Sequence, residues 1–239
     1  MAKSAEDVLY GSLTEKKLPF DLITEKRALK GVRGERFALD VKTFRTTKGM
    51  VRLTEIAQLV FTGRSAVQFY KEILPKIPKA EKDVLEKFEG KRAVFYFLGK
   101  KRYLQAKLEK ITPYFLILYL NRNGSHEYRV VYKLALAGVS PFSPYSLISE
   151  PEETVSFSSF AGSWREEVKE LEKMIAKTYR NTRKMGMDFL ITLLLRDGRE
   201  VKGLWRAKSN TNFVFRVYSP DPDKKETMII YKHAVEDYF

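Results

Sequence analysis

The sequence predicts a mainly β protein with a few helices, in which one small unit occurs three times. Two stretches rich in proline, serine or charge, at 74–83 and 140–163, read as loops or linkers that divide the chain. Each part opens with a short amphipathic helical pattern and continues with strand-sized apolar segments separated by polar turns. The expected boundaries are 1–64, 65–142 and 143–239, and the last part begins with the linker.

The helical patterns are predicted from their first residues. Each begins with a serine followed three residues later by an acidic residue or an amide, which is the pattern of a capping box. These pairs are Ser4 with Asp7, Ser65 with Gln68, and Ser163 with Glu166. In the third pattern apolar residues recur at helical spacing from Trp164 to Tyr179, so a long helix with one buried face is expected. The second pattern is broken by Pro75.

About five short strands are expected after each helix. The second strand of each unit carries a small residue at the same place, which allows a sharp bend, and these residues are Gly31, Ala106 and Gly203. An aromatic residue then begins the next strand, at Phe37, Tyr114 and Phe213. A sheet this small and this bent is expected to form a half-open barrel with exposed edges.

The three units end in related segments, "MVRLTEIAQLVF", "VVYKLALAGVSP" and "IIYKHAVEDYF". The last holds Tyr231, Lys232 and His233; the middle one keeps Tyr132 and Lys133 but replaces the histidine by leucine, and the first keeps none of the three. An aromatic ring can stack on an unpaired base, while Lys and His N–H groups can donate to base carbonyls, 2′-hydroxyls or phosphate. The segments therefore predict a site for single-stranded RNA that is most complete in the last unit.

The charge balance favours a polyanionic partner. The chain has 44 Lys and Arg against 30 Asp and Glu, a formal net charge of +14. Nucleic acid is the first partner to consider, and an anionic membrane surface the second. The absence of cysteine excludes disulfides and thiolate chemistry, and with only two histidines we expect no metal and no cofactor. No apolar stretch is of membrane-spanning length and the first residues do not form a secretory signal, so we expect a cytoplasmic protein without a membrane partner.

The same segments resemble a known family. "LLLRDGREVKG" is similar to the first sequence motif of the Hfq family of Sm-like RNA chaperones, and "IIYKHAV" resembles its Tyr-Lys-His second motif. The middle unit is similar through "KKRYLQAKLEKITPYFLILYL", and the first keeps "LPFDLITEKRALKG" and the position of Phe37. The resemblance covers most of the chain and implies three tandem Sm-like modules, each a helix on a five-stranded, strongly bent sheet.

The resemblance also implies a site. In this family six units close a ring by pairing edge strands, and uridine-rich RNA binds around the pore. By similarity Tyr231, Lys232 and His233 are expected at the pore, with Phe213 stacking beside a base and Asn212 next to it. A partial site is expected from Tyr114, Tyr132 and Lys133 of the middle unit. The residues expected near the basic rim are Arg180, Arg183 and Lys184.

Three units per chain further imply that two chains form a pseudo-hexameric ring as a homodimer. We therefore expect a non-enzymatic RNA-binding protein, an RNA chaperone or post-transcriptional regulator, for which U-rich RNA is a candidate ligand. A second hypothesis is a protein-interaction scaffold whose modules have lost RNA binding, as the divergent first segment suggests. A third is a nuclease that uses His233, but the sequence contains no phosphate-binding glycine loop or nucleophile motif, and no partner carboxylate can be assigned.

Overall fold

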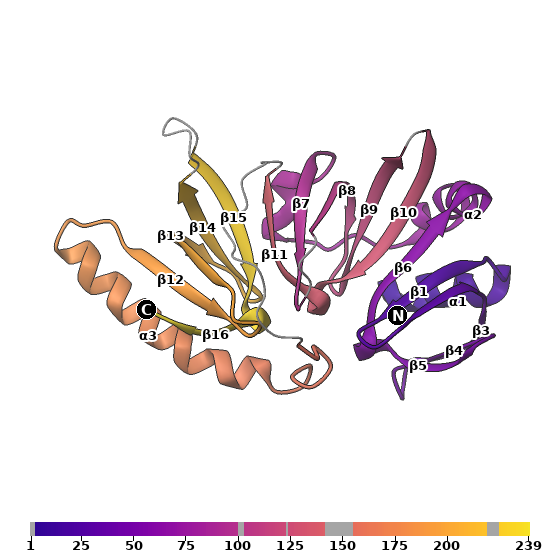
Figure 1. Ribbon diagram of the computed structural model, residues 1–239, viewed down its shortest axis with the longest axis horizontal. Helices are drawn as coiled ribbons and strands as arrows, with labels where there is room; N and C mark the ends of the chain where they lie inside the picture. The colour runs from indigo at the N-terminus through magenta and orange to yellow at the C-terminus, as the bar shows by residue number, and fades with distance from the viewer. Residues whose placement is uncertain (1–2, 100–102, 123, 142–154, 219–224) are drawn as a thin grey trace. The chain divides into compact units, whose positions relative to one another are not determined.

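The computed structural model describes residues 3–99, 103–122, 124–141, 155–218 and 225–239, so most of the expected linker, at 142–154, lies outside the described residues. The described residues form a mainly antiparallel β fold with three α-helices, in line with the mainly β class that the sequence predicts (Figure 1). The helices are α1 (Ala5–Lys16), α2 (Gly63–Gln68) and α3 (Trp164–Lys184). The strands are β1 (Phe20–Thr24), β2 (Ala28–Val32), β3 (Gly34–Ala38), β4 (Thr43–Thr46), β5 (Gly49–Arg52), β6 (Ile56–Thr62), β7 (Arg92–Phe97), β8 (Leu104–Ile111), β9 (Phe115–Arg122), β10 (Ser125–Tyr132), β11 (Leu136–Pro141), β12 (Leu190–Leu195), β13 (Glu200–Lys208), β14 (Asn212–Tyr218), β15 (Lys225–Tyr231) and β16 (Val235–Tyr238).

The predicted capping box of α1 and the predicted buried face of α3 are confirmed. The predicted start of α2 and the predicted cap of α3 are corrected. At α1 the expected capping box is present, since the Ser4 hydroxyl accepts from the Asp7 N–H at 3.0 Å and the Asp7 carboxylate accepts from the Ser4 N–H at 3.1 Å. Helix α3 has the expected buried face, but the Ser163 side chain makes no capping bond. The N-cap of α2 is Thr62 rather than Ser65, and the backbone beyond Gln68 continues as short π and 3-10 turns.

Two compact units make up the chain. Unit 1 contains residues 1–91 and 106–135, and unit 2 contains residues 92–105 and 136–239. The segment expected as the middle module therefore contributes β8, β9 and β10 to unit 1, and β7 and β11 to unit 2. Among the described residues, no helix combines the length and apolar character needed to cross a membrane.

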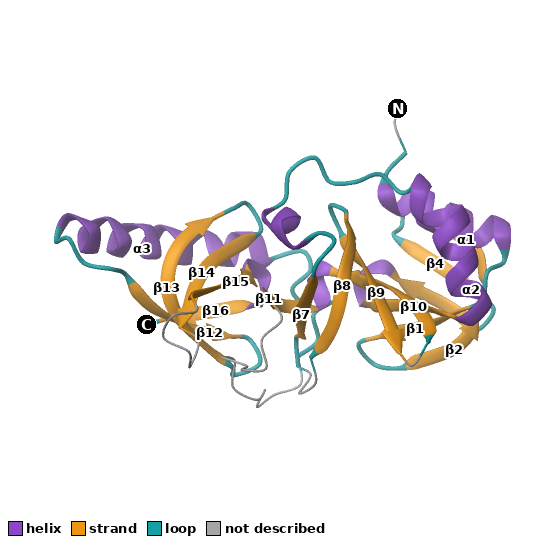
Figure 2. Cartoon of the chain, turned by 90° about the horizontal axis from the view of Figure 1, so that it is seen from above, coloured by secondary structure: helices purple, strands orange, loops and turns teal. Residues whose placement is uncertain are grey.

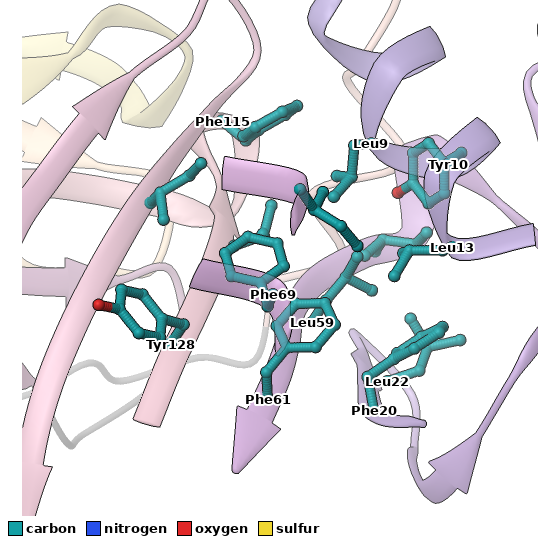
Figure 3. Packing of buried hydrophobic residues seen from close by; sticks show 14 of the residues in the cluster. Leu9, Tyr10, Leu13, Phe20, Leu22, Leu59, Phe61, Phe69, Phe115 and Tyr128 are labelled. Atoms are coloured by element: carbon teal, nitrogen blue, oxygen red, sulfur yellow. The ribbon is translucent and has the colours of Figure 1, made fainter. Parts of the chain in front are cut away.

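Unit 1 contains the strands β8-β9-β10-β6-β1-β2 in that spatial order and a separate three-stranded sheet, β3-β4-β5. Helix α1 packs on β3 and buries Leu9, Tyr10 and Leu13. Figure 3 shows these side chains facing the aromatic and aliphatic side chains of β1 and β6, among them Phe20 and Phe61. Burial of several such side chains, at about 1.5–3 kcal/mol each, is the main source of stability for this unit.

Unit 2 contains the strands β16-β12-β13-β14-β15-β11-β7 in spatial order, with α3 packed beside β16 (Figure 2). Its core includes an aromatic group in which the Trp205 ring centroid lies 5.2 Å from Phe213 and 5.7 Å from Phe215. The apolar face of α3 closes this core with Val168, Leu171 and Ile175, as the helical spacing predicts.

The same local arrangement occurs once in each of the three predicted parts of the chain, 1–64, 65–142 and 143–239, which are called thirds below. A three-residue 3-10 turn follows β5, β10 and β15, and the turns are Leu53–Glu55, Lys133–Ala135 and Lys232–Ala234. The strand after each turn then pairs antiparallel with the first strand of its own third, as β6 with β1, β11 with β7, and β16 with β12. The related endings of the sequence thus adopt one backbone conformation.

The register of these strands corrects one expectation. The first residue of each turn donates its N–H to the carbonyl of the residue just before β4, β9 or β14, and the three bonds are Leu53 to Lys42, Lys133 to Tyr114 and Lys232 to Thr211. Tyr114 therefore corresponds to Thr211, and the residues that correspond to Phe213 are Phe44 and Leu116. The expected equivalence of Phe37 and Tyr114 with Phe213 is wrong because the loops before these strands differ in length. Phe37 instead lies in β3 and stacks on Tyr10.

Candidate nucleic-acid-binding site

The Tyr-Lys-His segment lies at the end of β15 and in the turn that follows it. Tyr231, Lys232 and His233 are buried, with exposed fractions of 1, 2 and 4%. Their surroundings come from α3, from the residues just before it, and from the start of β11. We call the group formed by Phe213, Tyr231, Lys232 and His233 the motif cluster.

Lys232 lies between an aromatic face and a carboxylate. Its ammonium is 5.4 Å from the centroid of the Phe213 ring, within the range of a cation–π contact, and it forms an ion pair with Glu172 of α3. Glu172 also accepts from Lys208 at 2.6 Å. Burial acts to raise the pKa of Glu172, but the hydrogen bonds from Lys208 and Lys232 outweigh it and lower the pKa below its usual value. Glu172 is therefore ionised at neutral pH and occupies a position where two cations converge.

His233 is held by backbone and aromatic contacts. Its Nε2 atom lies 2.9 Å from the carbonyl oxygen of Leu136 at the start of β11, and its ring stacks on Tyr231 with centroids 5.4 Å apart. Phe160 and Trp164 cover the imidazole, with ring centroids at 6.2 and 5.8 Å. These contacts join the last turn of the chain to β11 within unit 2.

Phe213 lies beside Lys232, and Asn212 is opposite Tyr231 on the neighbouring strand, but neither is open to a ligand. Phe213 is fully buried against Trp205. The expectation of a ring free to stack on a base is not met in this conformation, because the aromatic core of unit 2 surrounds the ring. The side-chain oxygen of Asn212 is buried and has no hydrogen-bond partner among the described residues.

The partial site expected in the middle third is divided between the interior and the surface. The Tyr132 hydroxyl lies 2.5 Å from the Tyr10 hydroxyl in the interior of unit 1, and Lys133 is paired with Asp83 at 2.6 Å. Tyr114 is 55% exposed and is the member of this group that presents a ring to solvent. A carboxylate from the segment before the strands thus neutralises the motif lysine here, as Glu172 does for Lys232.

The Tyr10–Tyr132 contact gives a first prediction. Because each hydroxyl is buried against the other, Tyr132→Phe is expected to leave the Tyr10 hydroxyl without its partner and to lower the free energy of unfolding by about 1–3 kcal/mol. The double replacement with Tyr10→Phe is expected to recover most of this loss, since no unpaired hydroxyl then remains. Urea denaturation of the two single variants and the double variant measures the difference. Additive losses would contradict the assigned contact.

The residues expected at a rim are exposed. Arg180, Arg183 and Lys184 lie on the last turns of α3, where Arg183 also contacts the Tyr179 ring. The first turns of the same helix are acidic, so this charge order also favours the helix dipole. The three side chains are exposed, so a ligand can reach them.

Sequence reasoning did not identify three residues that complete the site. Glu172 and Asp83 neutralise the two motif lysines, and Lys208 supplies the exposed cation next to Lys232. Their distances along the chain from the residues they contact follow no motif. The one available signal for Glu172 was its place on α3, next to the apolar Leu171 that points into the core.

No protein-family model, no curated protein and no solved structure matches this chain.

Proposed function

We propose that this protein binds single-stranded RNA through three tandem Sm-like modules, with U-rich RNA as the candidate ligand. The observation that carries the proposal is the motif cluster, in which Lys232, Phe213, Tyr231 and His233 gather in one place with the exposed Lys208 beside them. Cations next to aromatic rings are the groups that single-stranded nucleic acids require. The recurrence of the same strand, turn and strand in each third supports the modular part of the proposal.

Exposed cations of unit 2 are the entry point for RNA in this proposal. Lys208 and the basic end of α3 are exposed, whereas Phe213 and His233 are covered. Phosphates therefore meet Lys208, Arg180 and Arg183 first, and the net charge of +14 draws the polyanion toward the protein. Contact with the rings of the cluster requires that RNA replaces the Glu172 carboxylate at Lys208 and Lys232.

Fluorescence anisotropy with U-rich, A-rich and random single strands, repeated over a salt series, tests the proposal. Wild-type protein is expected to bind U-rich RNA most tightly, with affinity that falls steeply as salt rises. The variant Lys208→Gln with Arg180→Gln and Arg183→Gln is expected to reduce the slope of log affinity against log salt by about 2, at about 0.7 per lost phosphate contact. Phe213→Ala is unsuitable, because loss of a buried ring alone destabilises the fold.

The matched control removes three exposed cations elsewhere, by Lys71→Gln, Lys76→Gln and Lys82→Gln. This variant has the same net charge as the test variant but is expected to keep more of the wild-type slope. Feeble binding of all three strands by the wild-type protein, independent of salt, would contradict the proposed function.

Self-association is the second part of the proposal. Strand β6 of the first third pairs with β10 of the second, and β11 of the second pairs with β15 of the third. Within the described residues, β5 pairs only with β4 and β16 only with β12. The strand before the turn of the first third, β5, and the strand after the turn of the last third, β16, thus each have one free edge. We propose that β16 of one copy pairs with β5 of a second copy, so that two such junctions close a homodimeric ring.

The internal junctions define the register of the proposed one. Val131 faces Gln58 in the first junction, and Ile230 faces Gly138 in the second. In both pairs the first residue lies two positions before the first residue of the 3-10 turn in its own third. The second lies five positions after the first residue of the turn in its own third. The same position in the proposed junction pairs Val51 with Asp237 of the other copy. One residue further along, Arg52 faces Glu236, so the two free strand edges are complementary in charge as well as in hydrogen bonding.

The scaffold hypothesis is the second candidate, and one observation favours it. Lys133 and Lys232 are both neutralised by carboxylates of the same chain, which is the arrangement expected if the motif positions stabilise the fold rather than bind phosphate. Equal and weak binding of the three RNA strands by a stable dimer would favour this candidate. No observation favours a nuclease, since His233 is buried and engaged with the Leu136 carbonyl.

A further inference from the structure

A second cationic surface lies on the three-stranded sheet β3-β4-β5 of unit 1, a sheet that contains none of the motif residues. One face of this sheet is buried and carries Phe44 and Val51, which are opposite each other in the register. Because side chains alternate between faces, the residues next to these point to the other face. That outward face carries Arg36, Arg45, Met50 and Arg52, all of which are exposed. We call it the arginine face.

The arginine face places like charges together. Arg36 and Arg45 are directly opposite each other on β3 and β4, and Met50 is opposite Arg45 on β5. Like charges directly opposite in an antiparallel pair destabilise a sheet. The neighbouring carboxylate that compensates is Glu35, which accepts from Arg45 Nε at 3.1 Å. A like-charge arginine pair on an exposed face, with one carboxylate bonded beside it, is suited to an anionic ligand.

The local charge is concentrated here. Within residues 33–52 the cations are Arg33, Arg36, Lys42, Arg45, Lys48 and Arg52, against the acids Glu35 and Asp40. Arginine presents a planar fork that bonds phosphate oxygens in pairs and stacks on bases, so it suits a nucleic-acid backbone better than a point charge does. Met50, 67% exposed, supplies an apolar contact among the guanidinium groups.

We propose that the arginine face is a binding surface for the phosphate backbone of single-stranded RNA. This inference rests on the proposed function, because it assigns a second contact to the same class of ligand. It gives the first third of the chain, whose ending lacks the Tyr-Lys-His residues, a role in binding that uses different side chains. The alternative partner, an acidic protein segment, is an outcome of the test below.

The test variant is Arg36→Gln with Arg45→Gln, which leaves Arg52 and the buried face intact. With a U-rich single strand as the probe, the slope of log affinity against log salt is expected to fall by about 1.4, at about 0.7 for each phosphate contact. The variant is expected to unfold at the same or a slightly higher temperature than wild type, because a like-charge pair has been removed. The matched control, Lys71→Gln with Lys76→Gln, has the same net charge on a different surface and is expected to retain the wild-type slope.

The outcomes separate this inference from the proposed function. If wild-type protein binds RNA but the test variant matches the control in slope, the arginine face is not an RNA surface, and the proposed function stands. If wild-type protein binds no RNA, both fail together, including the case in which the face holds an acidic protein segment instead. If the double variant unfolds at a lower temperature, Arg36→Gln and Arg45→Gln are compared singly, and each is expected to lower the slope by about 0.7.

Discussion

Replacing Arg52 by Glu is expected to convert a two-chain assembly into single chains, and adding Glu236→Arg to the same chain is expected to restore it. In the proposed junction Arg52 of one copy faces Glu236 of the other, because the register of both internal junctions is applied to the free edges of β5 and β16. The single replacement puts two carboxylates opposite each other at both junctions, whereas the double replacement restores opposite charges. Sedimentation velocity at micromolar concentration measures the mass of each variant.

The matched control is Lys71→Glu, which makes the same charge change at an exposed position of unit 1 outside β5. It is expected to leave the mass unchanged. A wild-type protein that sediments as a single chain at tens of micromolar would rule out the proposed junction, as would a double variant that stays monomeric while the control stays dimeric.

Asp197→Ala is expected to lower the free energy of unfolding by about 3–5 kcal/mol, the cost of breaking a buried ion pair by removing one partner. Asp197 and Arg199, only 0 and 2% exposed, are bonded to each other at 2.9 and 2.6 Å in the turn between β12 and β13. Asp197 also accepts from the Gly99 N–H at 2.8 Å, and Arg199 donates to the Phe97 carbonyl at 2.7 Å. Without Asp197, the Arg199 charge remains buried with one carbonyl as its partner.

Urea denaturation measures this effect, with Glu166→Ala as its control. Glu166 forms an ion pair with Lys169 on the exposed surface of α3, where such pairs contribute about 0–1 kcal/mol. A loss below about 1 kcal/mol for Asp197→Ala would mean that the Asp197–Arg199 pair does not stabilise this turn or its hydrogen bonds to the end of β7. The prediction concerns unit 2 alone and is independent of RNA binding.

The sequence predicted the features that depend on local chemistry. The capping box at Ser4 and the buried face of α3 follow from residue spacing, and both are present. Gly31 has a φ of 59°, a conformation that favours glycine, in the strand where a small residue was expected to permit a bend. The related endings of the three thirds share one strand, turn and strand conformation.

The features that depend on distant contacts were not predictable. Burial of the motif cluster results from α3 and from Phe160, which precede the cluster by about sixty to seventy residues and follow no motif spacing. The correspondence of Tyr114 with Thr211 depends on loop lengths that only the backbone bonds reveal. Glu172 was not identified because a glutamate on an amphipathic helix ordinarily faces solvent, whereas here it meets two lysines.

Size-exclusion chromatography at low salt, with light scattering and absorbance at 260 and 280 nm recorded together, tests the central claim most directly. Protein purified without nuclease treatment is expected to elute with the mass of two chains plus bound nucleic acid. The excess absorbance at 260 nm should disappear when the same sample is run at high salt, because the contacts are largely electrostatic. A single-chain mass with a protein-only absorbance ratio at both salt concentrations would contradict both the RNA-binding function and the assembly.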